Sequence, residues 1–168
     1  MTLEPTDYEL LRSLGFEKIG HWKINKDDDD LLIPCFDKTS VVNEYRTKPA
    51  LYAFMSDDKR TKEKIVRYIG KVECSDKPLE DRLTNYKNIH PDKKKSHAKR
   101  GRLIRDLLKT NHEVLIFAHV PKEEKTYRGI IDINLIDGLE YPIAQKFKER
   151  NGNEMWNKRC VKIPEKNF

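Results

Sequence analysis

Short hydrophobic blocks alternate with charged stretches along the chain, and the spacing within each block predicts one helix or strand. Residues 7–15 predict a short helix, because Thr6 can cap its start and Gly15 can end it. Residues 16–24 and 31–36 predict two strands. The four acids at 27–30 indicate a solvated turn between them rather than a metal site. The polar residues 37–48 predict a linker.

From residue 50 onward the predicted order is strand, strand, helix, helix, strand, helix. Residues 50–55 and 65–72 predict strands with a polar connection, which is typical of a hairpin. Pro78 opens a helix, because proline tolerates the first helical turn. Residues 96–109 predict a basic helix, 114–120 a strand, and 130–147 a mostly helical segment that Gly138 and Pro142 should bend. The buried side of the basic helix is expected to hold Leu103, Ile104, Leu107 and Leu108.

This order is typical of an α+β fold, with a small, mainly antiparallel sheet of about three core strands flanked by helices. The 168 residues suffice for one domain with a substantial core. We therefore divide the chain into two parts that form a single globular unit. Residues 1–48 are an N-terminal helix and strand extension, packed on a core domain of residues 49–168.

Positive charge is concentrated in one stretch. The net charge is +6, and residues 87–105 contain eight basic side chains against one acid, Asp92. Such a field favours a polyanion, whose phosphates would dominate the binding. A solvated, lysine-rich face is an alternative of equal weight. The basic side chains are Lys87, Lys93, Lys94, Lys95, Lys99, Arg100, Arg102 and Arg105.

Cysteine usage and the N-terminus indicate the compartment. Cys35, Cys74 and Cys160 are far apart and show no metal-ligand spacing, which argues against a zinc site or a disulfide framework. The N-terminus lacks the basic region and apolar stretch of a signal peptide. No apolar run approaches the length of a membrane span. We expect a cytoplasmic protein with no membrane partner.

Two tyrosines stand on the two strands of the predicted hairpin. One lies in Tyr68-Ile69-Gly70, followed by Lys71, and the other in Ala50-Leu51-Tyr52. Downstream come Arg82, Tyr86 one turn later, Glu140, and the pair Trp156-Asn157. In this order, over about residues 50–157, the set resembles the GIY-YIG nuclease superfamily. It is most similar to the small type II restriction endonucleases of that superfamily.

The resemblance implies a metal-dependent endonuclease that hydrolyses DNA phosphodiester bonds at specific sequences. Glu140 would hold one divalent metal ion, Mg2+ in the first place and Mn2+ in the second. One carboxylate suffices, because magnesium takes few protein ligands and keeps several waters. Arg82 would stabilise charge on the scissile phosphate. Tyr52 or Tyr68 would accept the proton of the attacking water, and the sequence leaves open which one.

Further residues have supporting roles under the same resemblance. Lys71 or the metal would favour a phenolate, and Tyr86 would contact a flanking phosphate or relay the proton. Asn157 would orient Glu140 or a phosphate. The partner would be double-stranded DNA, and a homodimer would suit a palindromic site. The expected DNA contacts are Lys87, His90, Lys93, Lys94, Lys95, Lys99, Arg100, Arg102 and Arg105.

Three features depart from the family pattern. Ala50 stands where glycine is usual, the longer stretch between Tyr52 and Tyr68 implies a longer hairpin loop, and Gly138 and Pro142 bracket Glu140. Ala50 and the long hairpin support one alternative, a non-catalytic nucleic-acid-binding module on a decayed nuclease fold. A separate alternative is a structure-specific nuclease of repair or recombination, which acts on branched DNA or on RNA.

Each residue taken singly also has a structural explanation. Tyrosines pack well in sheets, and Arg82 could pair with a helix acid such as Glu80. The histidines at 97, 112 and 119 show no ligand spacing, so we expect them to be structural.

Overall fold

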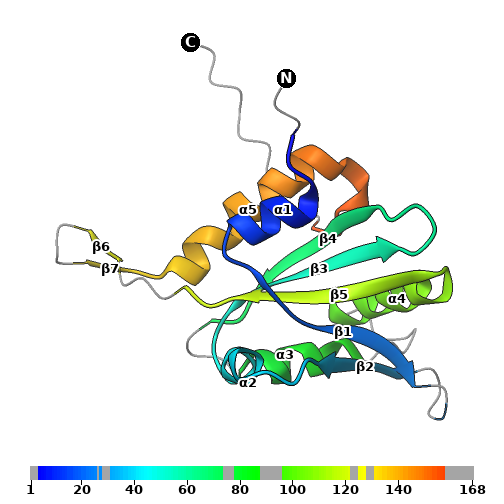
Figure 1. The fold of residues 1–168 in the computed structure, drawn as a ribbon. Coiled ribbons are helices and arrows are strands. Elements are labelled where there is room, and N and C mark those ends of the chain that lie inside the picture. The colour runs from blue at the N-terminus through cyan, green and yellow to red at the C-terminus, as the bar shows by residue number, and fades with distance from the viewer. Residues whose placement is uncertain are drawn as a thin grey trace.

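The computed structural model describes residues 4–25, 27, 31–73, 78–87, 96–121, 125–127 and 131–157. Its centre is a five-stranded antiparallel sheet with the strand order β2-β1-β5-β3-β4 (Figure 1). The strands are β1 (Glu17–Asn25), β2 (Leu31–Phe36), β3 (Leu51–Asp58), β4 (Lys64–Lys71) and β5 (His112–His119). A separate two-stranded sheet pairs β6 (Lys125–Tyr127) with β7 (Ile131–Ile133).

The α+β architecture and the hairpin of β3 and β4 are confirmed, but the prediction of about three core strands was too low. The first 48 residues contribute β1 and β2 to the main sheet, where β1 pairs with β5. The free edge of β5 needs hydrogen-bond partners, and β1 supplies them. Local periodicity predicted both strands and could not show this pairing.

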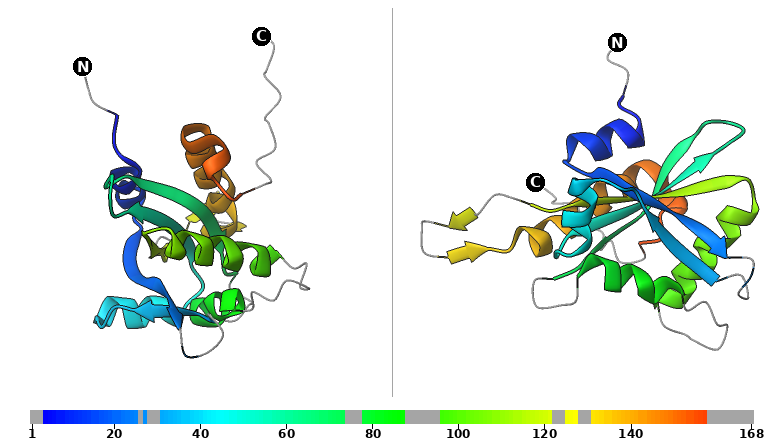
Figure 2. Two further views of the ribbon diagram at one scale, coloured as in Figure 1. Left: turned by 90° about the vertical axis from the view of Figure 1, so that its right-hand side faces the viewer. Right: turned by 60° about the horizontal axis from the view of Figure 1, so that its bottom comes forward.

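Helices cover both faces of the sheet (Figures 1 and 2). On one face lie α1 (Asp7–Ser13) and α5 (Leu135–Asn151), and the other face carries α2 (Ser40–Arg46), α3 (Leu79–Thr84) and α4 (Ser96–Lys109). Two short 3-10 helices, η1 (Asn85–Lys87) and η2 (Gly152–Glu154), follow α3 and α5.

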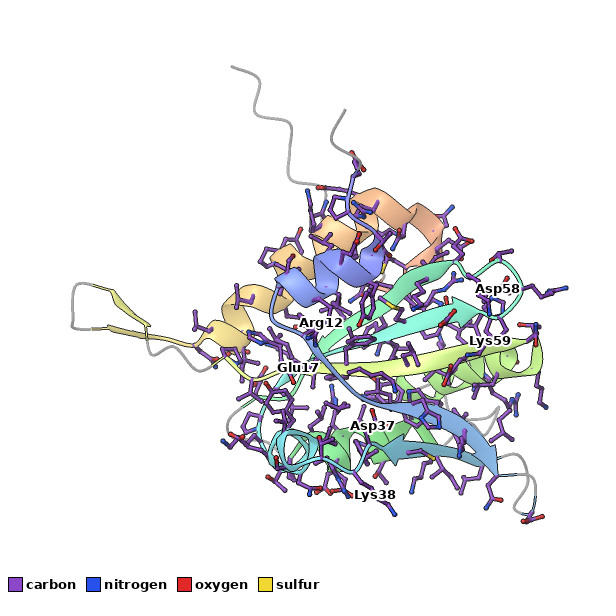
Figure 3. All side chains as sticks on the ribbon, in the orientation of Figure 1. Arg12, Glu17, Asp37, Lys38, Asp58 and Lys59 are labelled. Atoms are coloured by element: carbon purple, nitrogen blue, oxygen red, sulfur yellow. The ribbon has the colours of Figure 1, made fainter. Side chains whose placement is uncertain are left out.

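Strand β3 lies inside this sandwich and is buried on both faces. Leu51, Ala53 and Met55 pack against α1 and α5, whereas Tyr52 and Phe54 pack against the helices of the opposite face. This explains the continuous apolar run at residues 50–55, because a strand covered on both sides does not alternate with polar residues. Charged residues such as Asp58 and Lys59 lie at the hairpin end of the strand (Figure 3).

The sequence predicted a linker at residues 37–48. This prediction is wrong, because these residues contain α2. Thr39 caps this helix by accepting a hydrogen bond from the backbone N–H of Val42 at 3.2 Å. Val42 and Tyr45 lie three positions apart and are both buried. The sequence contains both the capping residue and this spacing, but the surrounding polar residues led to the prediction of a linker.

Two details of the helices also differ from prediction. Leu103 is 40% exposed, and of the four apolar residues assigned to the buried side of α4 only Ile104 is fully buried, with Leu107 and Leu108 partly so. Helix α5 begins at Leu135, after the short strand β7, rather than at residue 130. It continues through Gly138 and Pro142 to Asn151.

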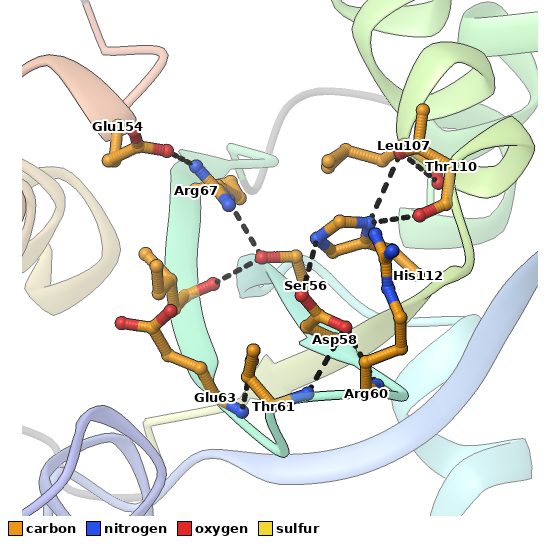
Figure 4. Close-up of polar contacts among 11 residues, drawn as sticks. Ser56, Asp58, Arg60, Thr61, Glu63, Arg67, Leu107, Thr110, His112 and Glu154 are labelled. Atoms are coloured by element: carbon orange, nitrogen blue, oxygen red, sulfur yellow. Dashed lines mark hydrogen bonds and ion pairs between the residues drawn. The ribbon is translucent and has the colours of Figure 1, made fainter.

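The extra spacing between Tyr52 and Tyr68 lengthens the strands and not the loop. Pairing of β3 with β4 continues to Asp57 opposite Lys64, so the turn covers only residues 59–63. Asp58 stabilises the turn, since its Oδ1 accepts hydrogen bonds from the backbone N–H of Arg60 at 2.8 Å and of Thr61 at 3.4 Å (Figure 4). The expected longer loop is therefore wrong.

A buried side-chain hydrogen bond also connects the two strands of this hairpin. Arg67 donates a hydrogen bond from Nε to the Ser56 hydroxyl at 2.7 Å and forms an ion pair with Glu154 (Figure 4). At the turn, His112 lies 3.8 Å from Asp58 and next to Thr110, which agrees with its predicted structural role.

None of the helices in the described part of the chain combines the length and apolar character needed to cross a bilayer. Cys35 is a free thiol, whereas Cys74 and Cys160 lie outside the described residues.

Candidate active site

Three tyrosines meet on the face of the sheet that α3 and α4 cover. Tyr52 comes from β3, Tyr68 from β4 and Tyr86 from η1, and all three are buried. The hydroxyls of Tyr52 and Tyr86 lie 2.8 Å apart, and the ring centroids of Tyr52 and Tyr68 are 6.0 Å apart. The two motif tyrosines therefore share one face of the sheet, and Tyr86 joins them.

Gly70 makes this cluster possible. It lies opposite Tyr52 in the sheet register. A Cβ at this position would come within 2.5 Å of Tyr52 Cζ and 2.8 Å of Tyr68 Cε1. The glycine of the Tyr-Ile-Gly motif is thus needed for space, because the two phenol rings occupy the volume of a side chain.

Arg82 lies beside the phenols. Helix α3 begins after Pro78 and is anchored by Leu79 and Leu83, both fully buried, which directs Arg82 towards the cluster. The pKa of Arg82 is raised overall. Burial alone would lower it, but the charge interaction and the side-chain hydrogen bond with Tyr52 raise it, and so do the charge interactions with Tyr86 and Tyr68. Among the described residues, Arg82 Nε has no hydrogen-bond partner.

The alternative in which Arg82 is a surface residue paired with Glu80 does not hold. Glu80 instead accepts hydrogen bonds from Arg46, with Oε1 2.6 Å from Arg46 Nη2 and Oε2 3.2 Å from Nε. This ion pair connects α2 to α3 and leaves Arg82 facing the phenols.

Glu140 reaches the same region from α5. Its carboxylate Oε2 lies 4.0 Å from Lys71 Nζ at the end of β4, and its side chain is 28% exposed. Burial raises the pKa of Glu140, while the charges of Lys71, Arg82 and Arg100 oppose the shift. The carboxylate is thus on the same side of the molecule as Arg82.

Lys71 connects β4 with the start of α5. Its Nζ lies 2.5 Å from Asp137 and 2.8 Å from Glu73, in addition to Glu140. The hydrogen bond to Asp137, followed by the one to Glu73, raises the pKa of Lys71. Asn134 caps α5 and also donates a hydrogen bond from Nδ2 to Asp137 Oδ2 at 2.7 Å. Sequence reasoning missed Asp137, although it lies three residues before Glu140, on the same side of a helix.

Arg100 also lies at this centre. Its guanidinium carbon is 4.2 Å from the centroid of the Tyr68 ring, and its charge acts on Tyr86 and Glu140 as well. The sequence predicted Arg100 only as one of many DNA contacts on a basic helix. Helical periodicity could have distinguished it, since Ile104 and Leu107 follow at the spacing of the buried side.

The buried phenols resist ionisation. Burial raises the pKa of Tyr68, and it raises the pKa of Tyr86 well above the ordinary range. For both, the charge interaction with Tyr52 acts in the same direction, and Arg100 opposes it. Both are neutral phenols in the structure as it stands, able to donate or accept a hydrogen bond.

Asn157 makes different contacts from those expected. Its Oδ1 accepts a hydrogen bond from Ile69 N at 3.0 Å, and its Nδ2 donates one to Ile69 O at 2.8 Å. The amide therefore binds the free edge of β4, between Tyr68 and Gly70, rather than Glu140.

The predicted DNA contacts are spread over several segments. His90, Lys93, Lys94 and Lys95 lie outside the described residues. Lys87 is in η1, and Lys99, Arg102 and Arg105 are on α4 with Arg100.

Two further histidines make contacts within the protein. His97 packs edge-on against Tyr86, with ring centroids 5.2 Å apart. His119 Nδ1 lies 3.0 Å from the carbonyl oxygen of Gly15.

In the described part of the chain, no three or more His, Cys, Asp or Glu side chains lie together in a group that could hold a metal ion. Glu140 is a carboxylate whose charge interacts with Tyr68 and Arg82. A metal ion bound to it would take most of its ligands from water and substrate.

A comparison with solved structures found a protein of the same fold. The structure of a mutant of bacteriophage T4 EndoII superposes with a TM-score of 0.59 at 19% identity, covering 84% of this chain and 94% of that one. Restriction endonuclease HPY188I in complex with product DNA gives a TM-score of 0.47 at 16% identity, covering 88% of this chain and 82% of that one. No protein-family model matches the chain, and no curated protein matches it. The chain therefore shares the fold of T4 EndoII.

Proposed function

We propose that this protein is a metal-dependent endonuclease that hydrolyses phosphodiester bonds in DNA, of the GIY-YIG type that its motifs resemble. The observation that carries the proposal is the convergence of Glu140, Arg82 and the three phenols from five separate elements. Their individual structural explanations do not account for a half-buried carboxylate and a half-buried guanidinium beside the same tyrosines. The fold shared with a phage endonuclease, EndoII, adds support.

The residues fit one divalent cation. The pKa of Glu140 is raised by burial, which means that its carboxylate is incompletely compensated by Lys71, Arg82 and Arg100. A hard cation such as Mg2+, with Mn2+ as the second choice, would compensate it and keep several waters. When bound, the ion would polarise the phosphate and stabilise the leaving oxygen.

The side chains divide the remaining work. Hydrolysis forms a bond from a water oxygen to phosphorus, breaks the bond to one sugar oxygen, and moves a proton from the water to a base. Arg82 neutralises the negative charge that grows on the phosphate oxygens. Lys71 remains an ammonium group because its pKa is raised, so it acts by its charge and not as a base. Tyr52 or Tyr68 would accept the proton as its phenolate, because a neutral phenol cannot act as this base, and a bound metal ion would favour the ionised form. Tyr86 holds the Tyr52 hydroxyl in place.

Double-stranded DNA is the proposed substrate, because α4 presents basic side chains beside the site and phosphate contacts dominate binding of this kind. We further propose that the protein cleaves at a specific sequence, in the manner of type II restriction enzymes. A two-fold dimer would suit a palindromic site.

The test is digestion of plasmid DNA with Mg2+ by the wild type and by Glu140→Gln. We expect the substitution to abolish cleavage, because a neutral amide cannot replace the metal-binding carboxylate. Glu149→Gln is the matched control: it makes the same change at an exposed position of the same helix, and it should cut like the wild type. Mg2+ affinity of the wild type should also weaken as pH falls, since a raised pKa lets protons compete with the metal earlier.

The outcomes separate the alternatives. Discrete fragments from duplex plasmid support a site-specific enzyme, whereas cutting only at junctions or flaps supports a structure-specific nuclease. Salt-dependent DNA binding by the wild type without any cleavage would support the binding module. Cleavage by Glu140→Gln at the wild-type rate would contradict the proposed metal ligand.

A further inference from the structure

Arg100 and Lys99 lie on different sides of α4. Lys99, Leu103 and Asp106 follow one another at helical spacing and are all exposed. Arg100 instead shares its side of the helix with Ile104, which is fully buried, and Leu107, which packs against the core. The basic helix therefore has an outer strip, to which Lys99 belongs, and an inner side that carries Arg100 towards the sheet.

On that inner side Arg100 ends above the phenol cluster. Its guanidinium carbon lies 4.2 Å from the Tyr68 ring centroid, at a distance typical of a cation–π contact. Tyr68 packs in the same cluster as Tyr52 and Tyr86, and the charge of Arg82 interacts with all three phenols. Arg82 from α3 and Arg100 from α4 thus approach the phenols from two different helices.

Within the described ranges, no residue takes a hydrogen bond from the guanidinium of Arg100. Among the described residues it forms no ion pair and donates no hydrogen bond, and its contact is with the face of a ring. Glu140 is close enough for their charges to interact without a direct bond. A guanidinium has five N–H donors in a planar fork that suits phosphate oxygens, and a purely structural arginine on a buried side would be expected to satisfy them within the protein.

We propose that Arg100 contacts the scissile phosphate together with Arg82, as a second catalytic arginine and not as part of the general DNA grip. This inference rests on the proposed nuclease function. The phosphate gains negative charge as the water oxygen bonds to phosphorus, and two guanidiniums beside the phenol cluster neutralise that charge better than one. Neither arginine exchanges a proton in this step.

The test separates rate from affinity. Single-turnover cleavage is measured at saturating protein, and DNA affinity is measured in parallel in a Glu140→Gln background that does not cut. Arg100→Ala should lower the saturated rate by about 100-fold or more while affinity changes by less than about threefold. Arg100→Lys should restore only part of the rate, because it keeps the charge and loses the planar fork.

Lys99→Ala is the matched control, one residue away on the outer strip. It should weaken binding, with a smaller salt dependence, and lower the saturated rate far less than Arg100→Ala does. The proposal is overturned if Arg100→Ala behaves like Lys99→Ala, or if Arg100→Lys restores the full rate. Thermal melting of each variant shows whether it is folded, and if Arg100→Ala is unfolded the comparison of Arg100→Lys with wild type decides.

Failure of the nuclease function itself would look different. In that case the wild type and Lys99→Ala would also cut no DNA, and the role of Arg100 would fall with it. If the wild type cuts and Glu140→Gln does not, the function stands and only the Arg100 variants decide the inference.

Discussion

At the scale of single residues, Gly70 shows how a motif residue acts through the space it leaves. The phenol of Tyr52 occupies the position where a side chain at residue 70 would lie. Tyr52 has no room to retreat, because its ring packs against Phe54, Tyr68 and Tyr86. The sequence revealed that a glycine follows the second tyrosine, but the reason for it is visible only in the packing across the two strands.

Substitution of Gly70 by alanine should therefore disturb the candidate site directly. We expect a loss of about 1–3 kcal/mol in the free energy of unfolding, from overpacking of a buried site, and a loss of DNA cleavage through displaced phenols. Gly138→Ala is the control, since nothing lies within 4 Å of a Cβ there. It should stabilise α5 by about 0.5–1 kcal/mol. Urea unfolding measures both, and equal effects of the two substitutions would contradict the explanation.

At the scale of elements, β4 is an edge strand that the C-terminal segment covers. Trp156 donates its backbone N–H to Arg67 O at 2.6 Å, and the Asn157 amide bonds both backbone groups of Ile69. These contacts satisfy groups that would otherwise be exposed on a strand carrying Tyr68 and Lys71. The aromatic–Asn pair was recognisable in the sequence, whereas its partner was not, because the two segments are far apart along the chain.

Loss of this cover should loosen β4. Asn157→Ala removes two hydrogen bonds and should lower the free energy of unfolding by about 1–3 kcal/mol. Cleavage should fall less than in Glu140→Gln, because Tyr68 and Lys71 remain on the strand. Asn153→Ala, at an exposed position of η2, should change neither property. Hydrogen exchange at the Ile69 amide gives a local measurement, and unchanged protection in Asn157→Ala would refute the role.

At the scale of the whole molecule, Asp7 joins three elements distant in sequence. This buried carboxylate in α1 accepts hydrogen bonds from Val66 N of β4 at 2.8 Å, Arg150 Nε at 3.0 Å and Asn151 Nδ2 at 2.6 Å, the last two from α5. Asn151 also donates to Val66 O at 3.2 Å. The N-terminal helix is thereby fixed to the strand and the helix that carry candidate site residues.

Asp7→Ala should destabilise the whole domain and not only its N-terminus. Three donors lose their acceptor, and we expect a loss on the order of 3 kcal/mol in the free energy of unfolding, measured by urea denaturation. Asp106→Ala, an exposed acid on α4, serves as the control and should change stability by less than about 0.5 kcal/mol. A single cooperative transition of unchanged midpoint in Asp7→Ala would contradict this account.

The sequence by itself determined most of the elements and the residues of the candidate site. Periodicity predicted α1, β1 to β5, α3, α4 and most of α5, because burial of one side of a helix or strand leaves a local record. The motif order named Tyr52, Tyr68, Arg82 and Glu140. The tertiary structure alone decided that β1 pairs with β5, that Asn157 binds Ile69, and that Arg100 lies over the ring of Tyr68. These depend on hydrogen bonds and packing between segments far apart in the chain, which leave no periodic signal in either segment.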